Sequence, residues 1–167
     1  LDSRFDNIMP WLSSVGAAVA SGDFDGDGFV DYYATNCGRN SQNRLFRNRG
    51  NGTFEDVAAQ WGVADYNRVG ASMDAIFLDY DNDGDEDLYL VKWAATNVLF
   101  ENTGDRFVDR SKEAGVGFWG YANSVVSLDY NRDGKLDILV GNYFAEEVQH
   151  EESGQMVPSK PNERDLF

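Results

Sequence analysis

Nine-residue acidic segments with the same spacing occur three times in this chain, and their residue types suit a hard metal cation. Each copy has an oxygen-bearing side chain at positions 1, 3, 5 and 9 and a glycine at position 6. The predicted side-chain ligands are Asp23, Asp25, Asp27 and Asp31 in the first copy, Asp79, Asp81, Asp83 and Asp87 in the second, and Asp129, Asn131, Asp133 and Asp137 in the third. Because Ca²⁺ takes about six to eight oxygen ligands in a flexible geometry, the pattern predicts one calcium site in each copy.

Positions 6 and 7 of the repeat support the same interpretation. Glycine at position 6 permits the sharp chain reversal that brings the later ligands back toward the first ones. Position 7 is Phe29, Asp85 or Lys135, and side chains so different indicate a ligand from the main-chain carbonyl. The alternative is a set of solvated Asp/Gly turns without metal, but clustered carboxylates would repel one another strongly in the absence of a cation. Asn131 supplies a neutral oxygen, so the third site is expected to be the weakest.

An EF-hand is excluded by the residues that follow each acidic segment. That motif requires a glutamate at position 12 and a helix after the loop. Here position 12 is Ala34, Leu90 or Val140, and each of these lies in an apolar, strand-like run. The loops are therefore expected to join β-strands.

The flanking segments repeat together with the loops and predict short β-strands. Apolar runs precede and follow each loop, and an Asn-x-Leu-Phe segment then begins a third strand at residues 43 and 97. A glycine-containing turn leads to a fourth strand at 53–57 and 106–109. The loops begin 79 − 23 = 56 and 129 − 79 = 50 residues apart, which is the size of one four-stranded propeller blade. The pattern predicts an all-β fold: part of a β-propeller, with a calcium loop between the first and second strand of each blade.

The chain is expected to be a single propeller region over residues 1–167, with about two and a half blades. The predicted units are 1–10 as the end of a preceding blade, 16–57 and 70–110 as blades, and 120–167 as an incomplete blade with a surface insertion at about 145–160. A closed propeller needs about four to eight blades. We therefore expect the remaining blades or partner subunits to cover the open sheet edges.

These loops and strands resemble the FG-GAP and VCBS repeats of integrin α-subunit propellers and of many bacterial surface proteins. The segment LDYDNDGDEDLYL at 78–90 and the pattern Asn-x-Leu-Phe-x-Asn-x-Gly are most similar to the ASPIC/UnbV, or cartilage acidic protein-like, branch. The resemblance covers nearly the whole chain outside the insertion. It implies calcium at the aspartates named above and an extracytoplasmic location: secreted, periplasmic or at the cell surface. The FG-GAP signature itself is only partial, at Gly16-Ala17-Ala18, and the carboxy-terminal portion of an ASPIC/UnbV protein is absent.

Composition narrows the function classes. With 14 basic and 29 acidic side chains the formal charge is −15, which disfavours nucleic acid and anionic lipid as partners. One cysteine excludes a disulfide within the chain, and no apolar run reaches the ~20 residues of a membrane span. The only histidine, His150, lies in the acidic insertion, and the sequence has no phosphate-binding or nucleophile motif.

We therefore expect a protein without enzymatic activity that acts as an interaction or scaffold module. The expected partner is another protein or a glycan, and one form of this hypothesis is an accessory subunit of an envelope complex. The alternative is the propeller scaffold of a secreted polysaccharide-active enzyme, a lyase or a hydrolase, because some enzymes use similar calcium loops.

Overall fold

The computed structural model describes residues 17–38, 40–64, 66–143, 148–150 and 156–158, and this part of the chain contains β-strands and no helix. The strands are β1 (Val19–Gly22), β2 (Asp31–Ala34), β3 (Arg44–Asn48), β4 (Phe54–Asp56), β5 (Ala71–Leu78), β6 (Asp87–Thr96), β7 (Val98–Asn102), β8 (Phe107–Asp109), β9 (Trp119–Leu128), β10 (Asp137–Asn142), β11 (Val148–His150) and β12 (Met156–Pro158). The predicted all-β class is confirmed. Within the described residues, no helix is long and apolar enough to cross a membrane.

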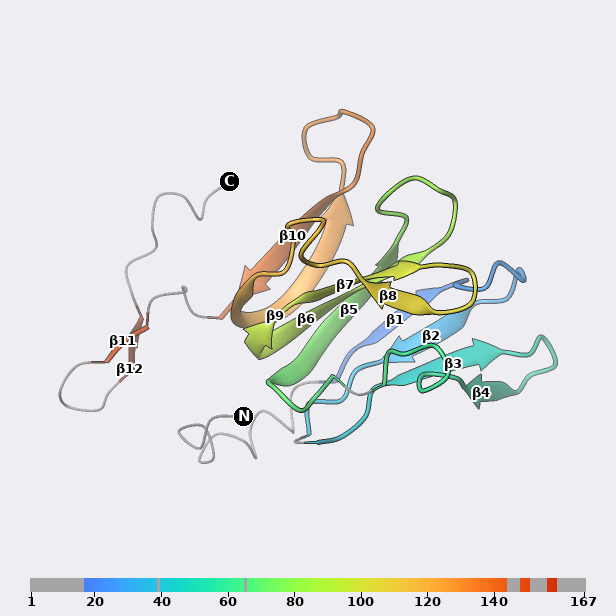
Figure 1. The fold of residues 1–167 in the computed structure, drawn as a ribbon, viewed down its shortest axis with the longest axis horizontal. Coiled ribbons are helices and arrows are strands. Elements are labelled where there is room, and N and C mark those ends of the chain that lie inside the picture. The colour runs from blue at the N-terminus through green and yellow to red at the C-terminus, as the bar shows by residue number, and fades with distance from the viewer. Residues whose placement is uncertain (1–16, 39, 65, 144–147, 151–155, 159–167) are drawn as a thin grey trace.

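Antiparallel pairing between neighbours in the chain builds the sheets. The first unit is a four-stranded sheet in the order β1-β2-β3-β4. The second unit repeats this order, because β5 pairs with β6, β6 with β7 and β7 with β8. In the third unit β9 pairs with β10. Figure 1 shows the three units side by side, with the β1–β2, β5–β6 and β9–β10 loops projecting from the same edge of the molecule.

The second and third units are joined into one sheet, which the repeat pattern did not predict. β6 continues beyond its pairing with β7, and its last residues pair with the start of β9: Trp93 with Tyr121, Ala95 with Gly120, and Thr96 with Trp119. The register shifts between Trp93 and Ala95, where Ala94 has a φ of 54°. This bulge at Ala94 allows the extended strand to turn toward the next unit.

The alternating side chains of β6 build the cores on both of its faces. Leu88 and Leu90 pack into the cluster between the first and second units, whereas Tyr89 and Val91 pack into the cluster between the second and third units. Burial of both faces explains the continuous apolar run in this strand. Neighbouring units thus cover both faces of β6.

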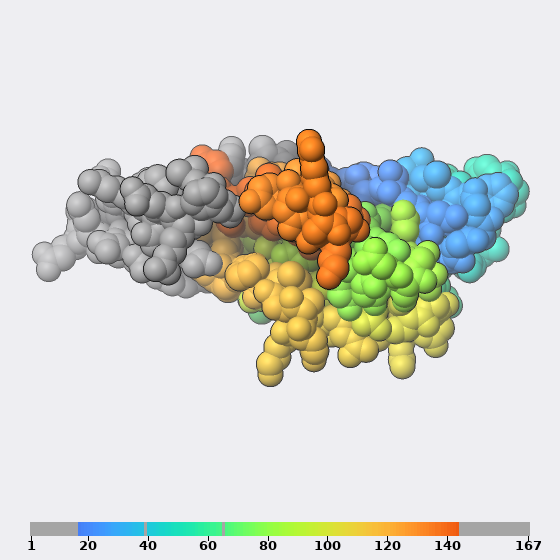
Figure 2. Space-filling model, turned by 90° about the horizontal axis from the view of Figure 1, so that it is seen from above, coloured from blue at the N-terminus to red at the C-terminus, as the bar shows by residue number. Residues whose placement is uncertain are grey.

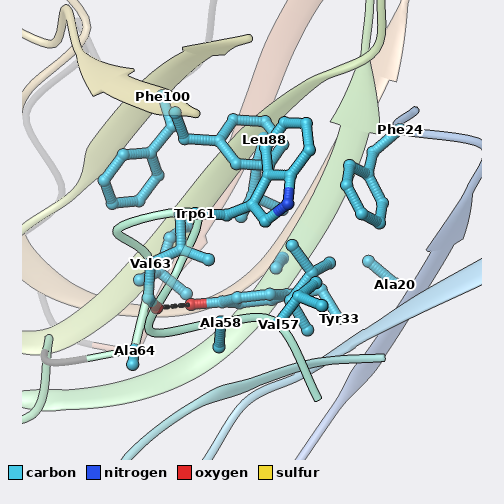
Figure 3. Packing of buried hydrophobic residues seen from close by; sticks show 14 of the residues in the cluster. Ala20, Phe24, Tyr33, Val57, Ala58, Trp61, Val63, Ala64, Leu88 and Phe100 are labelled. Carbon is cyan, nitrogen blue, oxygen red and sulfur yellow. Dashed lines mark hydrogen bonds between the residues drawn. The ribbon is translucent and has the colours of Figure 1, made fainter. Parts of the chain in front are cut away.

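The core between the first two units is centred on Tyr33 and Trp61 (Figure 3). The Tyr33 hydroxyl donates a hydrogen bond to the Val63 carbonyl (2.9 Å) and accepts one from Asn43 Nδ2 (2.9 Å). The ring of Trp61 meets that of Phe24 edge to face at 4.6 Å. Phe24 follows the first residue of the acidic loop, so this core anchors the loop to the connector after β4.

The outer faces of the two terminal units are exposed. On the first unit these apolar residues include Val19, Tyr32 and Phe54; on the third unit they include Val126, Leu128 and Leu139, which are 41–59% exposed. In Figure 2 the blue and cyan first unit lies at one end of the described part, beside the green and yellow second unit. The outer face of each terminal unit therefore has the apolar composition of a surface that packs against another sheet.

Part of the predicted surface insertion at about 145–160 is described. It contains a small antiparallel hairpin in which β11 pairs with β12, Gln149 opposite Val157. The predicted end of a preceding blade at 1–10 and the last residues of the incomplete blade, 159–167, lie outside the described residues.

Candidate metal centres

The aspartate at position 1 organises each acidic loop through its two carboxylate oxygens. These oxygens accept the backbone N–H groups of positions 5 and 6 at 3.0 and 2.9 Å in the first loop, 3.1 and 3.1 Å in the second, and 3.1 and 3.0 Å in the third. The glycines at position 6 all have positive φ: 87° at Gly28, 97° at Gly84 and 83° at Gly134. The three segments therefore fold into one turn, for which glycine is required at position 6.

Position 5 closes the turn by accepting the N–H of position 7 at 2.9 Å in all three loops. The residues at position 7, Phe29, Asp85 and Lys135, share this contact although their side chains differ in size and charge. Because the main chain at position 7 makes the same contact in all three loops, its carbonyl could serve as the same metal ligand in each. Those carbonyls remain predicted ligands.

Position 9 is the first residue of the second strand and is buried in the first two units. Asp31 and Asp87 are 0% and 1% exposed. Each accepts one N–H from position 2 of its own loop, at 3.3 and 3.0 Å, and one from the end of the third strand, Asn48 at 2.7 Å and Asn102 at 2.8 Å. Burial raises the pKa of both carboxyls to about 6, against the lowering effect of these hydrogen bonds.

Carboxylate oxygens converge in the first loop. Asp23, Asp25 and Asp27 each place one oxygen within 4.8 Å of the others. Burial, followed by the charge of Asp27, raises the pKa of Asp25. Asp25 Oδ1 is buried and has no hydrogen-bond partner. A buried oxygen of this kind is costly, and a bound cation would satisfy it.

The second loop gathers a related but different set: Asp79, Asp81 and Asp87 lie within the same 4.8 Å limit. Burial, followed by the charge of Asp83, raises the pKa of Asp81. Position 9 joins the cluster here, whereas in the first loop position 5 does so. Every donor in both sets is a carboxylate oxygen, and this is the chemistry that suits a hard cation.

The third loop is more exposed and carries less uncompensated charge. Asn131 Oδ1 accepts the N–H of Asp133 at 3.0 Å, and Asn131 Nδ2 donates to Asp133 Oδ2 at 3.0 Å. The hydrogen bond from the Lys135 N–H, and after it the one from Asn131 Nδ2, lowers the pKa of Asp133. Asp137 accepts the N–H of Tyr130 at 2.9 Å, as its counterparts do at position 2 of their loops. The turn is thus kept while the electrostatic repulsion is reduced.

The profile of the FG-GAP-like repeat matches residues 23–90 and 79–140, which together cover more than half of the chain and all three loops. The chain belongs to the FG-GAP-like repeat family. This membership confirms the resemblance predicted from the loops and strands, and it supports a propeller-like arrangement of the sheets. Cartilage acidic protein 1 of Xenopus tropicalis is 32% identical over 85 residues, which are 51% of this chain and 12% of that relative. The present chain therefore matches only a small part of the relative's length.

Two asparagines of the FG-GAP-like repeats have a role that the sequence alone did not reveal. Asn48 and Asn102 end the third strands, and besides contacting position 9 they donate from Nδ2 to the carbonyl of position 8, Val30 at 3.1 Å and Glu86 at 3.2 Å. The repeated Asn-x-Leu-Phe-x-Asn pattern contained this signal, because its second asparagine recurs at the same place. The pattern predicted a strand, but it did not indicate that the second asparagine hydrogen-bonds to the acidic loop.

The opposite end of the first FG-GAP-like unit has a polar cleft of about 610 Å³. The β2–β3 connection and the connector before β5 form it, and it is lined by Asn36, Asn40, Ser41, Gln42, Arg44, Asn67 and Arg68. Arg44 also pairs with Asp56. Its described lining is amide, hydroxyl and guanidinium, without a carboxylate.

Proposed function

We propose that this chain is the calcium-binding, propeller-like part of an extracytoplasmic protein and acts as an interaction or scaffold module. The observation that carries the proposal is the convergence of carboxylates in the first loop, which leaves the buried Asp25 Oδ1 without a partner. FG-GAP repeats often bind calcium, and the same turn occurs here three times. An oxygen-only donor set favours Ca²⁺ over softer metals.

Calcium in these loops would be structural. Positions 1, 3 and 5 precede the chain reversal and position 9 begins the second strand, so one ion would tie the two strands of a unit together. Three ions would change the formal charge from −15 to −15 + 6 = −9. A loop in which protein oxygens surround the ion keeps no position for a substrate, so the expected effect is on stability.

Calcium titration of the 167-residue chain, followed by calorimetry and thermal unfolding, tests this proposal. We expect calcium to raise the melting temperature and magnesium to do so much less, because Mg²⁺ requires a tighter octahedral site. Asp25→Asn should weaken calcium binding. Glu113→Gln also removes one negative charge, but at an exposed residue of the β8–β9 connector, and it should leave calcium binding unchanged. An unchanged melting temperature at millimolar calcium would contradict the proposal.

The interaction role is supported by the exposed apolar faces of the first and third units. We propose that further repeats of a longer chain, or a partner subunit, cover them. This chain matches only 12% of cartilage acidic protein 1, so in that relative a similar segment is accompanied by much additional chain. Sedimentation of the chain tests the proposal: we expect self-association that Leu139→Glu, on the outer face of β10, reduces. A monomer at every concentration would contradict it.

The polysaccharide-active alternative finds no specific support in the cleft. Hydrolases and lyases need a general acid or base, most often His, Glu, Asp, Lys or Tyr. The described lining contains none of these side chains. We therefore prefer the non-enzymatic function, and assays on acidic and neutral glycans test it. Turnover that survives calcium removal and disappears on mutation of a cleft residue would contradict this preference.

The proposed extracytoplasmic location follows from the calcium chemistry. Extracellular modules bind calcium at roughly 10⁻⁴–10⁻³ M, a range available outside the cytoplasm. Fractionation of the source cells tests this part of the proposal, and recovery of the protein with cytoplasmic markers would contradict it.

A further inference from the structure

The side chain of Glu86 reaches from the second loop to the first. Glu86 occupies position 8 of its loop, between the predicted ligands Asp85 and Asp87. Its Oε2 accepts the backbone N–H of Asp23, position 1 of the first loop, at 2.6 Å. The donor and acceptor are 63 residues apart in the sequence. The contact joins the main chain at one site to the side chain next to another.

Space for this contact comes from Gly22, the last residue of β1. A Cβ atom at this position would overlap Glu86 Oε2 and would lie 2.8 Å from the Phe77 ring. The equivalent residues before the other two loops are Leu78 and Leu128. Among the first strands that the structure describes, β1 ends in glycine where the side chain of Glu86 arrives from the next unit, and this contact requires a residue without a Cβ.

Asn102 makes a second link between the same two loops. Its Nδ2 donates to the carbonyl of Phe24 in the first loop at 2.7 Å and to the carbonyl of Glu86 at 3.2 Å. Its backbone N–H donates to Asp87 at 2.8 Å. One side chain thus contacts position 2 of the first loop and position 8 of the second, while its main chain supports position 9.

We propose that Glu86 and Asn102 couple the first two calcium sites, so that occupation of one site favours occupation of the other. The inference rests on the proposed calcium function. Ordering either loop fixes the Glu86–Asp23 contact and the Asn102 bridge, and these in turn order the other loop. The second ion then binds a loop whose conformational entropy has already been reduced, which is positive cooperativity.

The third site lies outside this pair. Position 8 of the first and third loops is Val30 and Leu136, whose side chains cannot accept a hydrogen bond. Both are exposed, at 51% and 47%. Val30→Ala and Leu136→Ala are therefore matched controls at the same loop position.

Site-resolved calcium titration by NMR of the 167-residue chain tests the proposal. The amides of Gly28, Gly84 and Gly134 report separately on the three loops. In the wild type we expect Gly28 and Gly84 to respond together, because a tenfold coupling gives a Hill coefficient of about 1.5. Gly134 should titrate on its own.

Glu86→Ala should lower the Hill coefficient of the pair from about 1.5 toward 1, because only the Asn102 bridge then remains, and should weaken the first site by roughly three- to tenfold. Glu86→Gln keeps an acceptor oxygen and should preserve most of the coupling. Gly22→Ala, which displaces the Glu86 carboxylate, should reproduce the alanine result. In calcium-free protein, hydrogen exchange of the Asp23 amide should be about tenfold faster in Glu86→Ala than in the wild type.

The outcomes separate the two proposals. If the glycines respond to calcium but Glu86→Ala leaves the pair titrating as before, the coupling through Glu86 is refuted and the calcium function stands. An unchanged exchange rate at Asp23 in that variant would also overturn it. If no glycine responds to millimolar calcium, the calcium function fails and the coupling fails with it, whatever the exchange rate shows.

Discussion

Acidification should raise the stability of the calcium-free protein and should reduce the additional stability that calcium provides. Asp31 and Asp87 are buried, and their folded-state pKa of about 6 lies above the ordinary value of 3.8. The folded protein therefore holds these two protons more tightly than the unfolded chain. The cost of the buried charges is fully present above about pH 6 and is relieved as the pH falls toward 4.

The size of the effect follows from these pKa values. Between about pH 7 and about pH 5, each carboxyl contributes roughly 1.4 kcal/mol of added stability to the calcium-free protein. The two together give about 3 kcal/mol, or roughly 6 to 12 °C in melting temperature for a chain of this size. Calcium requires both groups ionised, so its stabilising effect should shrink by the same amount over this range.

The assay is thermal unfolding at both pH values, with and without saturating calcium. Calcium should be removed on a chelating resin, because EDTA binds it poorly in acid. Comparison of the loaded and calcium-free protein at one pH cancels the titration of surface carboxylates outside the sites. A calcium-induced rise in melting temperature that is equal at both pH values would refute the assignment of Asp31 and Asp87 as ligands.

Three further predictions follow from the loops and the core. Asn131→Asp should tighten calcium binding at the third site by roughly tenfold, as measured by calorimetry, because it restores the carboxylate at position 3; weaker binding would contradict the ligand assignment. Gly84→Ala should lower the free energy of unfolding by about 1–2 kcal/mol in denaturant, since φ is 97° and the strain is confined to the backbone; a neutral effect would show that the turn relaxes. Tyr33→Phe should cost about 1–3 kcal/mol because it leaves the buried partners of the hydroxyl unsatisfied, whereas Tyr32→Phe on the exposed face of β2 should be nearly neutral.

The loops were the part of the site that the sequence predicted best. Side-chain chemistry at fixed spacing, repeated three times, indicates both the turn and its glycine, because the turn is made by contacts within nine residues. The hydrogen bonds that Asp23, Asp79 and Asp129 accept from the N–H groups of positions 5 and 6 are local in this sense. Strand order within a unit was predictable for the same reason, since neighbours in the chain pair with each other.

Contacts between units could not be predicted from one sequence. Glu86 has no counterpart at position 8 of the other loops, so nothing in the repeat marks it as a bridging residue. The pairing of β6 with β9 depends on where β6 bulges, at Ala94, and the apolar run of that strand does not indicate this position. The hairpin of β11 and β12 lies in a segment whose polar composition resembles that of a loop.

The way in which the units are joined sets the order in which the molecule should come apart. The second and third units share main-chain hydrogen bonds through β6 and β9, whereas β1–β4 form a separate sheet held to the second unit by its core, its connector and the Glu86 and Asn102 contacts. We expect a pulling force applied across the described part to separate β1 from β5 first, because no ladder of main-chain hydrogen bonds joins these two strands. The amino-terminal unit should then detach as a block while the rest keeps its shape, and the first and second acidic loops lie on opposite sides of that boundary.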